Sequence, residues 1–223
     1  KPLVQYGTPV ESLKIWRENI TPHFEQVPKE NRMTRIYQIL RERHAWYEQN
    51  HPEHPEQGIA LVYLRNRKAC EEYAKHFAEQ NLKAVAYHGK LDESQKKQIL
   101  QQFKNNELDV VVCTNAFGMG IDKSNVRYVI HYNMPGDLES YYQEAGRAGR
   151  DGLKSECILL FSERDKGLHE YFITVSQADD DYKDKMGEKL TKMIQYTKTK
   201  KCLEATIVHY FEPNENLEEC NQC

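Results

Sequence analysis

The sequence predicts an α/β fold, in which a parallel β-sheet is flanked by helices and followed by a small helical unit. Along residues 20–178, apolar runs of strand length alternate with amphipathic stretches of helical spacing. Strict alternation of this kind is typical of parallel sheets with helical connections. The run at residues 59–64 is continuously apolar, as expected for a strand that is covered on both faces. Parallel sheets bind ligands beyond the carboxyl ends of their strands, so we expect the functional residues at that edge.

The elements follow from the periodicity in chain order. Residues 1–19 have weak periodicity, and we interpret them as a linker or the tail of a preceding domain. Residues 20–27 alternate apolar and polar side chains like a strand. Residues 31–50 have helical spacing, which we expect to end before the proline-rich segment 51–55 because proline supplies no amide donor. The other predicted strands are 59–64, 84–88, 110–114, 128–133 and 156–161, and the other predicted helices are 66–80, 92–105, 138–146 and 164–175.

A run of three aspartates at 179–181 marks a break, so we expect one domain at residues 20–178 and a second unit at 179–223. Within that unit Leu190 and Met193 share one helical face, while lysines crowd the rest of the same helix. A solvated surface and a phosphate-facing surface both explain these lysines. A second helix is predicted at residues 202–211.

Size, charge and hydropathy limit the function. A chain of 223 residues has room for one domain and a small module, at about 150 residues per domain. The net charge of −3 gives no global basic signature, so nucleic-acid binding would depend on local patches. No apolar run approaches the roughly 18 residues that span a bilayer, and these residues contain no positively charged stretch followed by an apolar run of the signal-peptide kind. We expect an intracellular protein without a membrane partner, and a piece of a longer protein because the chain lacks an initiator Met.

Polar or glycine-bearing segments follow several predicted strands: 65–67, 88–90 and 114–120, with 143–150 closing the next helix. In the last of these, Arg147 and Arg150 are set among glycines. Guanidinium groups stay protonated and bind phosphate in a bidentate fork. A phosphate-cradling loop is not found, because the Gly89-Lys90 pair is followed by Leu91 instead of Ser or Thr. The sequence therefore predicts arginines that act on a nucleotide held elsewhere.

The six cysteines fall into two groups. Cys70, Cys113 and Cys157 lie in apolar or helical contexts and are predicted to be buried. Cys202, Cys220 and Cys223 stand near the end of the chain, the last two as a Cys-x-x-Cys pair. Tetrahedral zinc binding and three free thiols are both compatible with this spacing.

Three stretches resemble the RecQ family of DNA helicases, in the second helicase superfamily. Residues 62–67 are similar to helicase motif IV, residues 112–123 to motif V and residues 141–152 to motif VI. The superfamily shares the Gly-Arg-x-Gly-Arg of motif VI. Ala-Phe-Gly-Met-Gly at 116–120 and the terminal cysteines narrow the resemblance to RecQ. It implies a second RecA-like lobe at 20–178, with residues 1–19 as the tail of the first lobe.

The resemblance also implies roles for individual residues. Arg150 would be the arginine finger for ATP with Mg²⁺, which the first lobe mainly binds, and Arg147 would assist it. Gly120, Asp122 and Gln143 would lie beside the nucleotide. The residues that would contact single-stranded DNA are Thr114, Arg67, Asn66 and His88.

At the level of the whole protein, the resemblance implies ATP-driven 3′-to-5′ unwinding of duplex DNA, in the bacterial cytoplasm or the eukaryotic nucleus. The isolated chain would be inactive. Cys202, Cys220 and Cys223 would bind Zn²⁺ in a partial RecQ-type zinc-binding subdomain at 179–223. The fourth ligand would be water, His209, a neighbouring molecule or a following cysteine.

Two other functions remain open. One is a non-enzymatic module for nucleic-acid binding or zinc-dependent interaction that keeps the helicase-lobe fold. The other is an RNA helicase lobe, which the terminal cysteines and the sequence at 117–119 disfavour.

Overall fold

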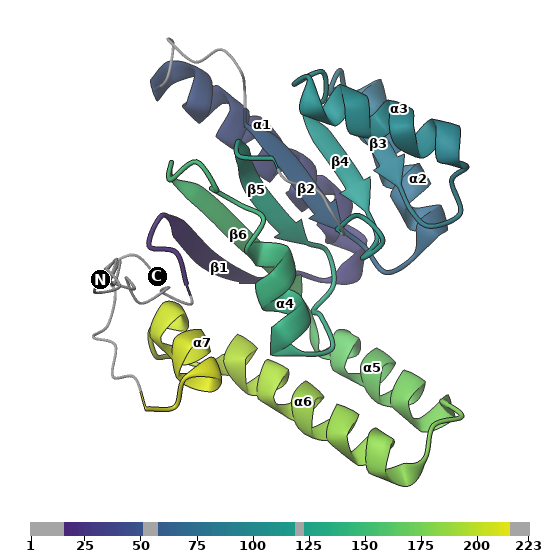
Figure 1. Cartoon of the computed structure of the whole chain (residues 1–223), viewed down its shortest axis with the longest axis vertical. Helices are drawn as coiled ribbons and strands as arrows, with labels where there is room; N and C mark the ends of the chain where they lie inside the picture. Colours follow the sequence, from purple (N-terminus) through teal and green to yellow (C-terminus); the bar gives the residue numbers. More distant parts are fainter. Residues whose placement is uncertain (1–15, 51–57, 119–122, 215–223) are drawn as a thin grey trace, which may run out of the picture.

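The predicted fold class is confirmed by the computed structural model, which describes residues 16–50, 58–118 and 123–214 (Figure 1). Six parallel strands form one sheet in the order β1-β6-β5-β2-β4-β3. The strands are β1 (Ile20–Gln26), β2 (Ile59–Tyr63), β3 (Ala84–Tyr87), β4 (Val110–Cys113), β5 (Val126–His131) and β6 (Ser155–Phe161). The helices are α1 (Arg32–Asn50), α2 (Arg67–Glu79), α3 (Glu93–Lys104), α4 (Leu138–Ala145), α5 (Glu163–Val175), α6 (Asp180–Lys198) and α7 (Leu203–Phe211), with a short 3₁₀ helix η1 (Lys29–Asn31).

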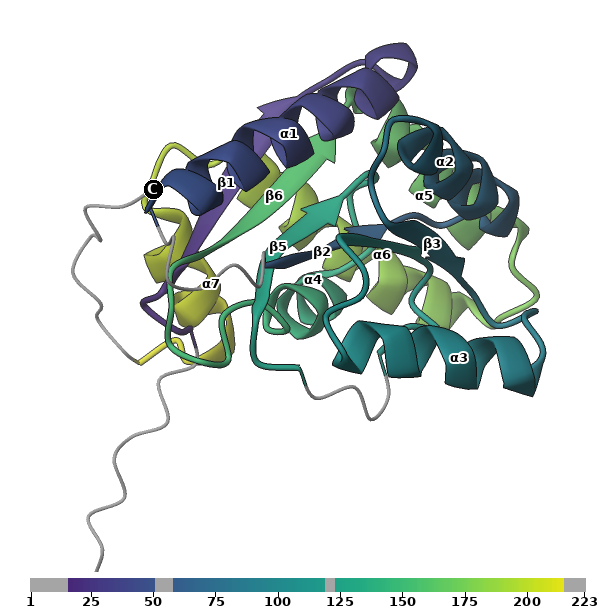
Figure 2. The ribbon, with the colours of Figure 1, turned by 90° about the horizontal axis from the view of Figure 1, so that it is seen from above.

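The sheet separates two hydrophobic cores (Figure 2). Every residue of β2 is buried, and its side chains alternate between the two cores because successive residues of a strand point to opposite faces. Helices α1 and α2 cover one face, and α3, α4, α6 and α7 contribute to the core on the other face. The continuous apolar run that predicted a doubly covered strand is thus explained.

The expected boundaries hold to within two residues, and the shifts have local causes. Asn66 and Asp92 cap α2 and α3 through their side chains instead of forming the first helical residues. Asp179 caps α6 in the same way, at the break expected from the aspartate run. Strand β5 begins two residues earlier than predicted, because it includes the charged but buried Arg127.

The helices after the sheet do not form a separate core. Leu190, Met193 and Tyr196 of α6 and Ile207 and Val208 of α7 belong to the same buried cluster as the sheet residues. The domain boundary at 178/179 stays a prediction. Among the described residues, no helix has the length and apolar character needed to cross a bilayer.

Candidate functional site

The carboxyl ends of β2, β4 and β5 meet at one edge of the sheet, as predicted. A cavity of about 320 Å³ opens between the segments that follow these strands. Arg65 follows β2, Asn115 follows β4 and Asn133 follows β5, while Glu144 and His169 enter from α4 and α5. Donors and acceptors from five elements therefore converge on one cavity.

The loop after α4 carries both candidate arginines. Its backbone turns at Gly149, which has a φ of +59° and donates its N–H to the carbonyl of Val126 at 2.8 Å. A Cβ at this position would lie 2.4 Å from Nδ2 of Asn19, so only glycine fits. Arg150 follows at once and is exposed, whereas Arg147 is half-buried. The two arginines therefore have different surroundings.

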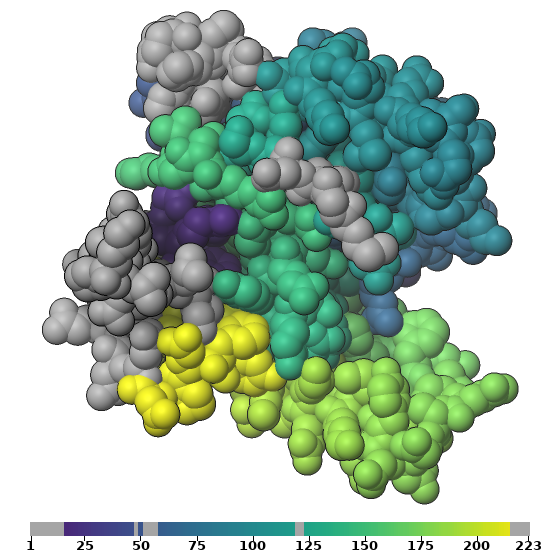
Figure 3. Space-filling view, viewed as in Figure 1, coloured from purple at the N-terminus to yellow at the C-terminus, as the bar shows by residue number. Residues whose placement is uncertain are grey.

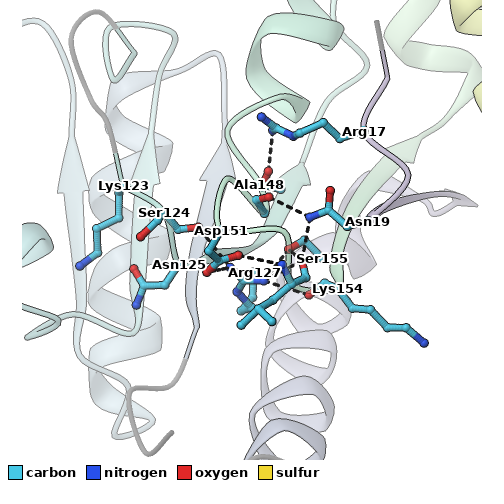
Figure 4. A network of polar contacts seen from close by, with 12 residues as sticks. Arg17, Asn19, Lys123, Ser124, Asn125, Arg127, Ala148, Asp151, Lys154 and Ser155 are labelled. Atoms are coloured by element: carbon cyan, nitrogen blue, oxygen red, sulfur yellow. Dashed lines mark hydrogen bonds and ion pairs between the residues drawn. The ribbon is translucent and has the colours of Figure 1, made fainter. Parts of the chain in front are cut away.

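Residues just before β1 hold this loop from one side (Figure 4). Arg17 donates to the carbonyls of Gly146 and Ala148, the latter at 2.6 Å. Asn19 donates to the carbonyls of Gly149 and Leu153, both at 2.8 Å. Burial and, secondly, the charge of Arg150 lower the pKa of Arg17. The arginine loop is thus bound to the segment that leads into β1, the edge strand of the sheet.

Arg127 holds the loop from the other side (Figure 4). Its side chain is 1% exposed and pairs with Asp151. It also donates to the carbonyl of Leu153 at 2.9 Å and to Oγ of Ser155 at 2.9 Å. Sequence reasoning missed this residue, although an arginine directly before a buried apolar run was a usable signal. A buried charge requires a partner, and here the partner lies beside Arg150.

Arg147 joins the arginine loop to the segment that follows β4. Its Nη1 donates to the carbonyl of Gly118 at 2.7 Å. A Cβ on Gly118 would lie 2.6 Å from Nη2 of Arg147, so a larger residue there would displace this guanidinium. Gly120 and Asp122, the predicted nucleotide contacts in this segment, lie outside the described residues. Gln143, the third one, is exposed on α4.

Beneath this junction, the buried Tyr63 and His131 form a polar group with the half-buried Glu144. The hydroxyl of Tyr63 donates to the carbonyl of Phe117 at 3.0 Å, next to the carbonyl that Arg147 binds. The Tyr63 and His131 rings stack with centres 5.5 Å apart, and His131 Nε2 lies 2.8 Å from Glu144 Oε2. Burial raises the pKa of Tyr63, so its hydroxyl keeps its proton. All three residues also line the cavity.

The predicted nucleic-acid contacts differ in how accessible they are. Arg67 is exposed at the start of α2, and Asn66 accepts from the backbone N–H of Lys68 and Ala69 as the helix cap. Thr114 is mostly buried, and its Oγ1 accepts from the N–H of Ala116 at 3.4 Å. His88 is 3% exposed and contacts Glu71 at 3.0 Å. Of the four side chains, Asn66 and Arg67 are exposed, whereas Thr114 and His88 are mostly buried.

Cys202 caps α7, where its Sγ accepts from the N–H of Ala205 at 3.4 Å. Cys220 and Cys223 lie outside the described residues, and the described part of the chain holds no group of three metal-ligating side chains. A helix N-terminus favours a thiolate, the form that binds zinc, so the position of Cys202 fits a ligand. Cys70, Cys113 and Cys157 are buried as predicted, and burial raises their pKa values, that of Cys70 to about 12.

Comparisons with known proteins show which families and proteins this chain is similar to. The family model described as "Helicase conserved C-terminal domain" matches residues 32–152, and "RecQ zinc-binding" matches residues 163–223. The chain is 44% identical over 163 residues to ATP-dependent DNA helicase RecQ of Bacillus subtilis, covering 73% of this chain and 27% of the relative. It is 32% identical over 201 residues to ATP-dependent DNA helicase hus2/rqh1 of Schizosaccharomyces pombe, covering 89% and 14%. The chain thus spans about a quarter or less of these relatives.

Two solved structures share the fold. A DEAD box protein from Methanococcus jannaschii has a TM-score of 0.54 and 24% identity, over 72% of this chain and 41% of that one. The Escherichia coli DEAD-box protein SrmB, bound to the regulator of ribonuclease activity A, also has a TM-score of 0.54, with 19% identity over 73% and 92%. These two likenesses concern the fold alone.

Proposed function

The chain belongs to the RecQ family of helicases, and from this we propose that it forms the second RecA-like lobe of an ATP-dependent DNA helicase that unwinds duplex DNA in the 3′-to-5′ direction. Its partners would be DNA, as a single strand or a fork, and a first lobe that holds ATP with Mg²⁺. It would work in the bacterial cytoplasm or the eukaryotic nucleus. The chain alone would not turn over ATP.

The observation that carries this proposal is the arginine loop. Arg17, Asn19 and Arg127 fix its backbone through hydrogen bonds, so the exposed Arg150 stands on a rigid support. A prepositioned guanidinium offsets the charge that develops on phosphoryl oxygens without reorganising during the reaction. Arg150 would supply that charge to a nucleotide across the interlobe cleft, with Gln143, Asp122 and Gly120 beside it.

Arg147 would assist in a different way. Its guanidinium binds the carbonyl of Gly118, so it ties the loop of Arg150 to the segment after β4. The same segment begins at Thr114, which with Arg67, Asn66 and His88 would follow the phosphates of a single strand. A shift of the bound DNA strand at Thr114 would therefore reach Arg147 through Gly118. Contacts to the backbone rather than to bases suit a motor that acts on any sequence.

Zinc would be bound by Cys202, Cys220 and Cys223 in the region that matches the RecQ zinc-binding model. Bound zinc would supply a structural crosslink between the start of α7 and the cysteine pair. The fourth ligand and the subdomain boundary at 179 are parts of the same proposal.

The decisive experiment measures ATP turnover in the full-length helicase with single-stranded DNA. Arg150→Ala should lower kcat by at least about a thousandfold, the range attributed to arginine fingers, while nucleotide binding stays within a few-fold. Arg41→Ala, which removes an exposed arginine on α1, is the matched control. Unchanged turnover in the Arg150 variant, or turnover by the present chain alone, would contradict the proposal.

A further inference from the structure

Helix α5 carries an apolar stripe that the described residues leave uncovered. Leu168, Tyr171, Phe172 and Val175 are spaced i, i+3, i+4 and i+7, so they share one helical face. Tyr171 is 60% exposed and Phe172 48%. Figures 1 and 3 show α5 and α6 at one end of the molecule, beyond the sheet. Such an exposed stripe marks an interaction surface.

A cation from the candidate site lies against this stripe. The guanidinium carbon of Arg65 lies 5.0 Å from the centre of the Phe172 ring. Its Nη1 lies 3.1 Å from Nε2 of His169, on the same helix. Arg65 is the residue after Leu64 at the carboxyl end of β2 and lines the 320 Å³ cavity. The stripe on α5 is therefore continuous with the carboxyl edge of the sheet.

Two more cations follow Arg65 along the chain. Arg67 and Lys68 are exposed in the first turn of α2. Within the described ranges, no carboxylate forms an ion pair with Arg65, Arg67 or Lys68. Their charge is thus available to an anionic partner that also covers the rings of α5.

We propose that Tyr171 and Phe172, with Arg65, form a base-stacking site for single-stranded nucleic acid. Bases of a single strand are free to stack on aromatic side chains, while basic residues follow the phosphates. Here Arg67 and Lys68 hold the backbone, and the strand continues from the sheet edge onto α5. The site would extend the proposed track for single-stranded DNA, which Thr114, Arg67, Asn66 and His88 form, and it rests on that proposed function.

The charge and the ring geometry favour this occupant over a protein helix. The aromatic rings lie in the middle of the stripe, between Leu168 and Val175, and the guanidinium of Arg65 already faces the Phe172 ring. A docking protein helix would leave these three cations at its rim without a defined partner. Duplex nucleic acid offers phosphates, but its bases are stacked and cannot cover the rings.

The test measures fluorescence anisotropy of a fluorescein-labelled thymidine 20-mer with this chain, beside an abasic 20-mer of equal charge. Tyr171→Ala and Phe172→Ala should each weaken binding of the thymidine strand about fivefold or more and leave abasic binding unchanged. Phe172→Trp should bind the thymidine strand about as tightly as the wild type, because it keeps an aromatic ring at this position. Trp46→Ala removes an aromatic side chain on α1 that is 45% exposed, and it should have no effect.

Each of three other outcomes would contradict the stacking site. Equal affinity of the wild type and both alanine variants, with weaker binding by Arg67→Ala, overturns the stacking site but leaves the proposed track intact. No binding of either oligonucleotide by the wild type counts against both. Self-association that Phe172→Ala abolishes, with unchanged oligonucleotide affinity, assigns the stripe to protein contact and overturns the inference.

Discussion

Single glycines decide the shape of the arginine loop. Gly149 and Gly152 both have positive φ, +59° and +81°. They differ in their surroundings, because a Cβ at Gly149 would meet Asn19 and Ser155, whereas nothing lies within 4 Å of one at Gly152. Alanine variants at the two positions therefore separate the cost of backbone strain from the cost of steric contact.

Gly149→Ala should destabilise the chain by about 2–3 kcal/mol, and Gly152→Ala by about 1 kcal/mol. The difference arises because an alanine at 149 displaces the Asn19 amide, which donates to the carbonyls of Gly149 and Leu153. Chemical denaturation measures both values. Equal losses for the two variants would show that Asn19 does not fix the loop.

Tyr63→Phe tests the junction under Arg147. The variant keeps the ring stacked on His131 and removes the hydroxyl bonded to Phe117, which leaves that carbonyl unpaired at a cost of about 1–2 kcal/mol. If the segment after β4 transmits strand binding to Arg147, DNA stimulation of ATP turnover should fall while turnover without DNA changes little. Tyr73→Phe, on α2 in the opposite core, is the control. An unchanged stimulation ratio would contradict the role of Tyr63.

Residue identities could be predicted from motifs, but their contacts could not. The arginine–glycine spacing indicated Arg147 and Arg150 as a pair, yet the structure separates a half-buried Arg147 from an exposed Arg150. That difference depends on Gly118, 29 residues earlier in the chain. Arg17 and Arg127 were not predicted because their partners are backbone carbonyls and a carboxylate far along the chain, which periodicity does not reveal.

At the scale of elements, the sequence predicted the strands and helices well because both cores are regular. The ends of helices and strands were harder to predict where polar side chains are buried. Helix α5 is an example, since Asp165 closes its capping box and also pairs with the fully buried Arg32. Helical spacing predicts that α5 exists but not that its first turn is anchored to α1, nor that His169 faces the cavity.

His169 gives α5 a dependence on pH. Burial lowers its pKa, the charge of Arg65 lowers it further, and the Met134 carbonyl, Asp165 and Asp137 act in the opposite direction. As the pH falls, His169 therefore takes up a proton at a higher pH in the unfolded chain than in the folded chain. The stabilisation is present above the unfolded pKa of about 6.5 and is lost as pH falls through the lower folded value.

Between these two pKa values, the free energy of unfolding should fall with decreasing pH by up to about 1.4 kcal/mol per unit more in the wild type than in His169→Gln. Denaturant titrations at several pH values from 8 down to 5 measure the difference. His76→Gln, at a half-buried histidine on α2, corrects for the loss of an imidazole elsewhere. Parallel pH profiles for wild type and His169→Gln would show that protonation of His169 does not oppose folding.

At the scale of the whole molecule, the helices after the sheet are joined to it. Tyr196 of α6 meets Tyr141 of α4 and Phe24 of β1 through ring contacts, with ring centres 5.7 and 5.0 Å apart. Lys189 of α6 also pairs with Glu139 of α4 at 3.0 Å. Since α4 leads into the arginine loop, the region that matches the zinc-binding family supports the element that carries Arg147 and Arg150.

Because of this connection, zinc binding would affect the stability of the whole chain as well as the local geometry at Cys202. Cys202 caps α7, whose Ile207 and Val208 are buried in the same core as Tyr196.

If Cys202, Cys220 and Cys223 bind zinc, the purified chain should contain about one zinc ion, and Cys202→Ser should remove most of it, as elemental mass spectrometry can measure. Cys70→Ala, at a buried cysteine of α2, should keep the metal. A chelator should lower the melting temperature of the wild type but not that of Cys202→Ser, because ligand binding to the folded state stabilises it. Equal zinc content in the wild type and Cys202→Ser would rule out Cys202 as a ligand.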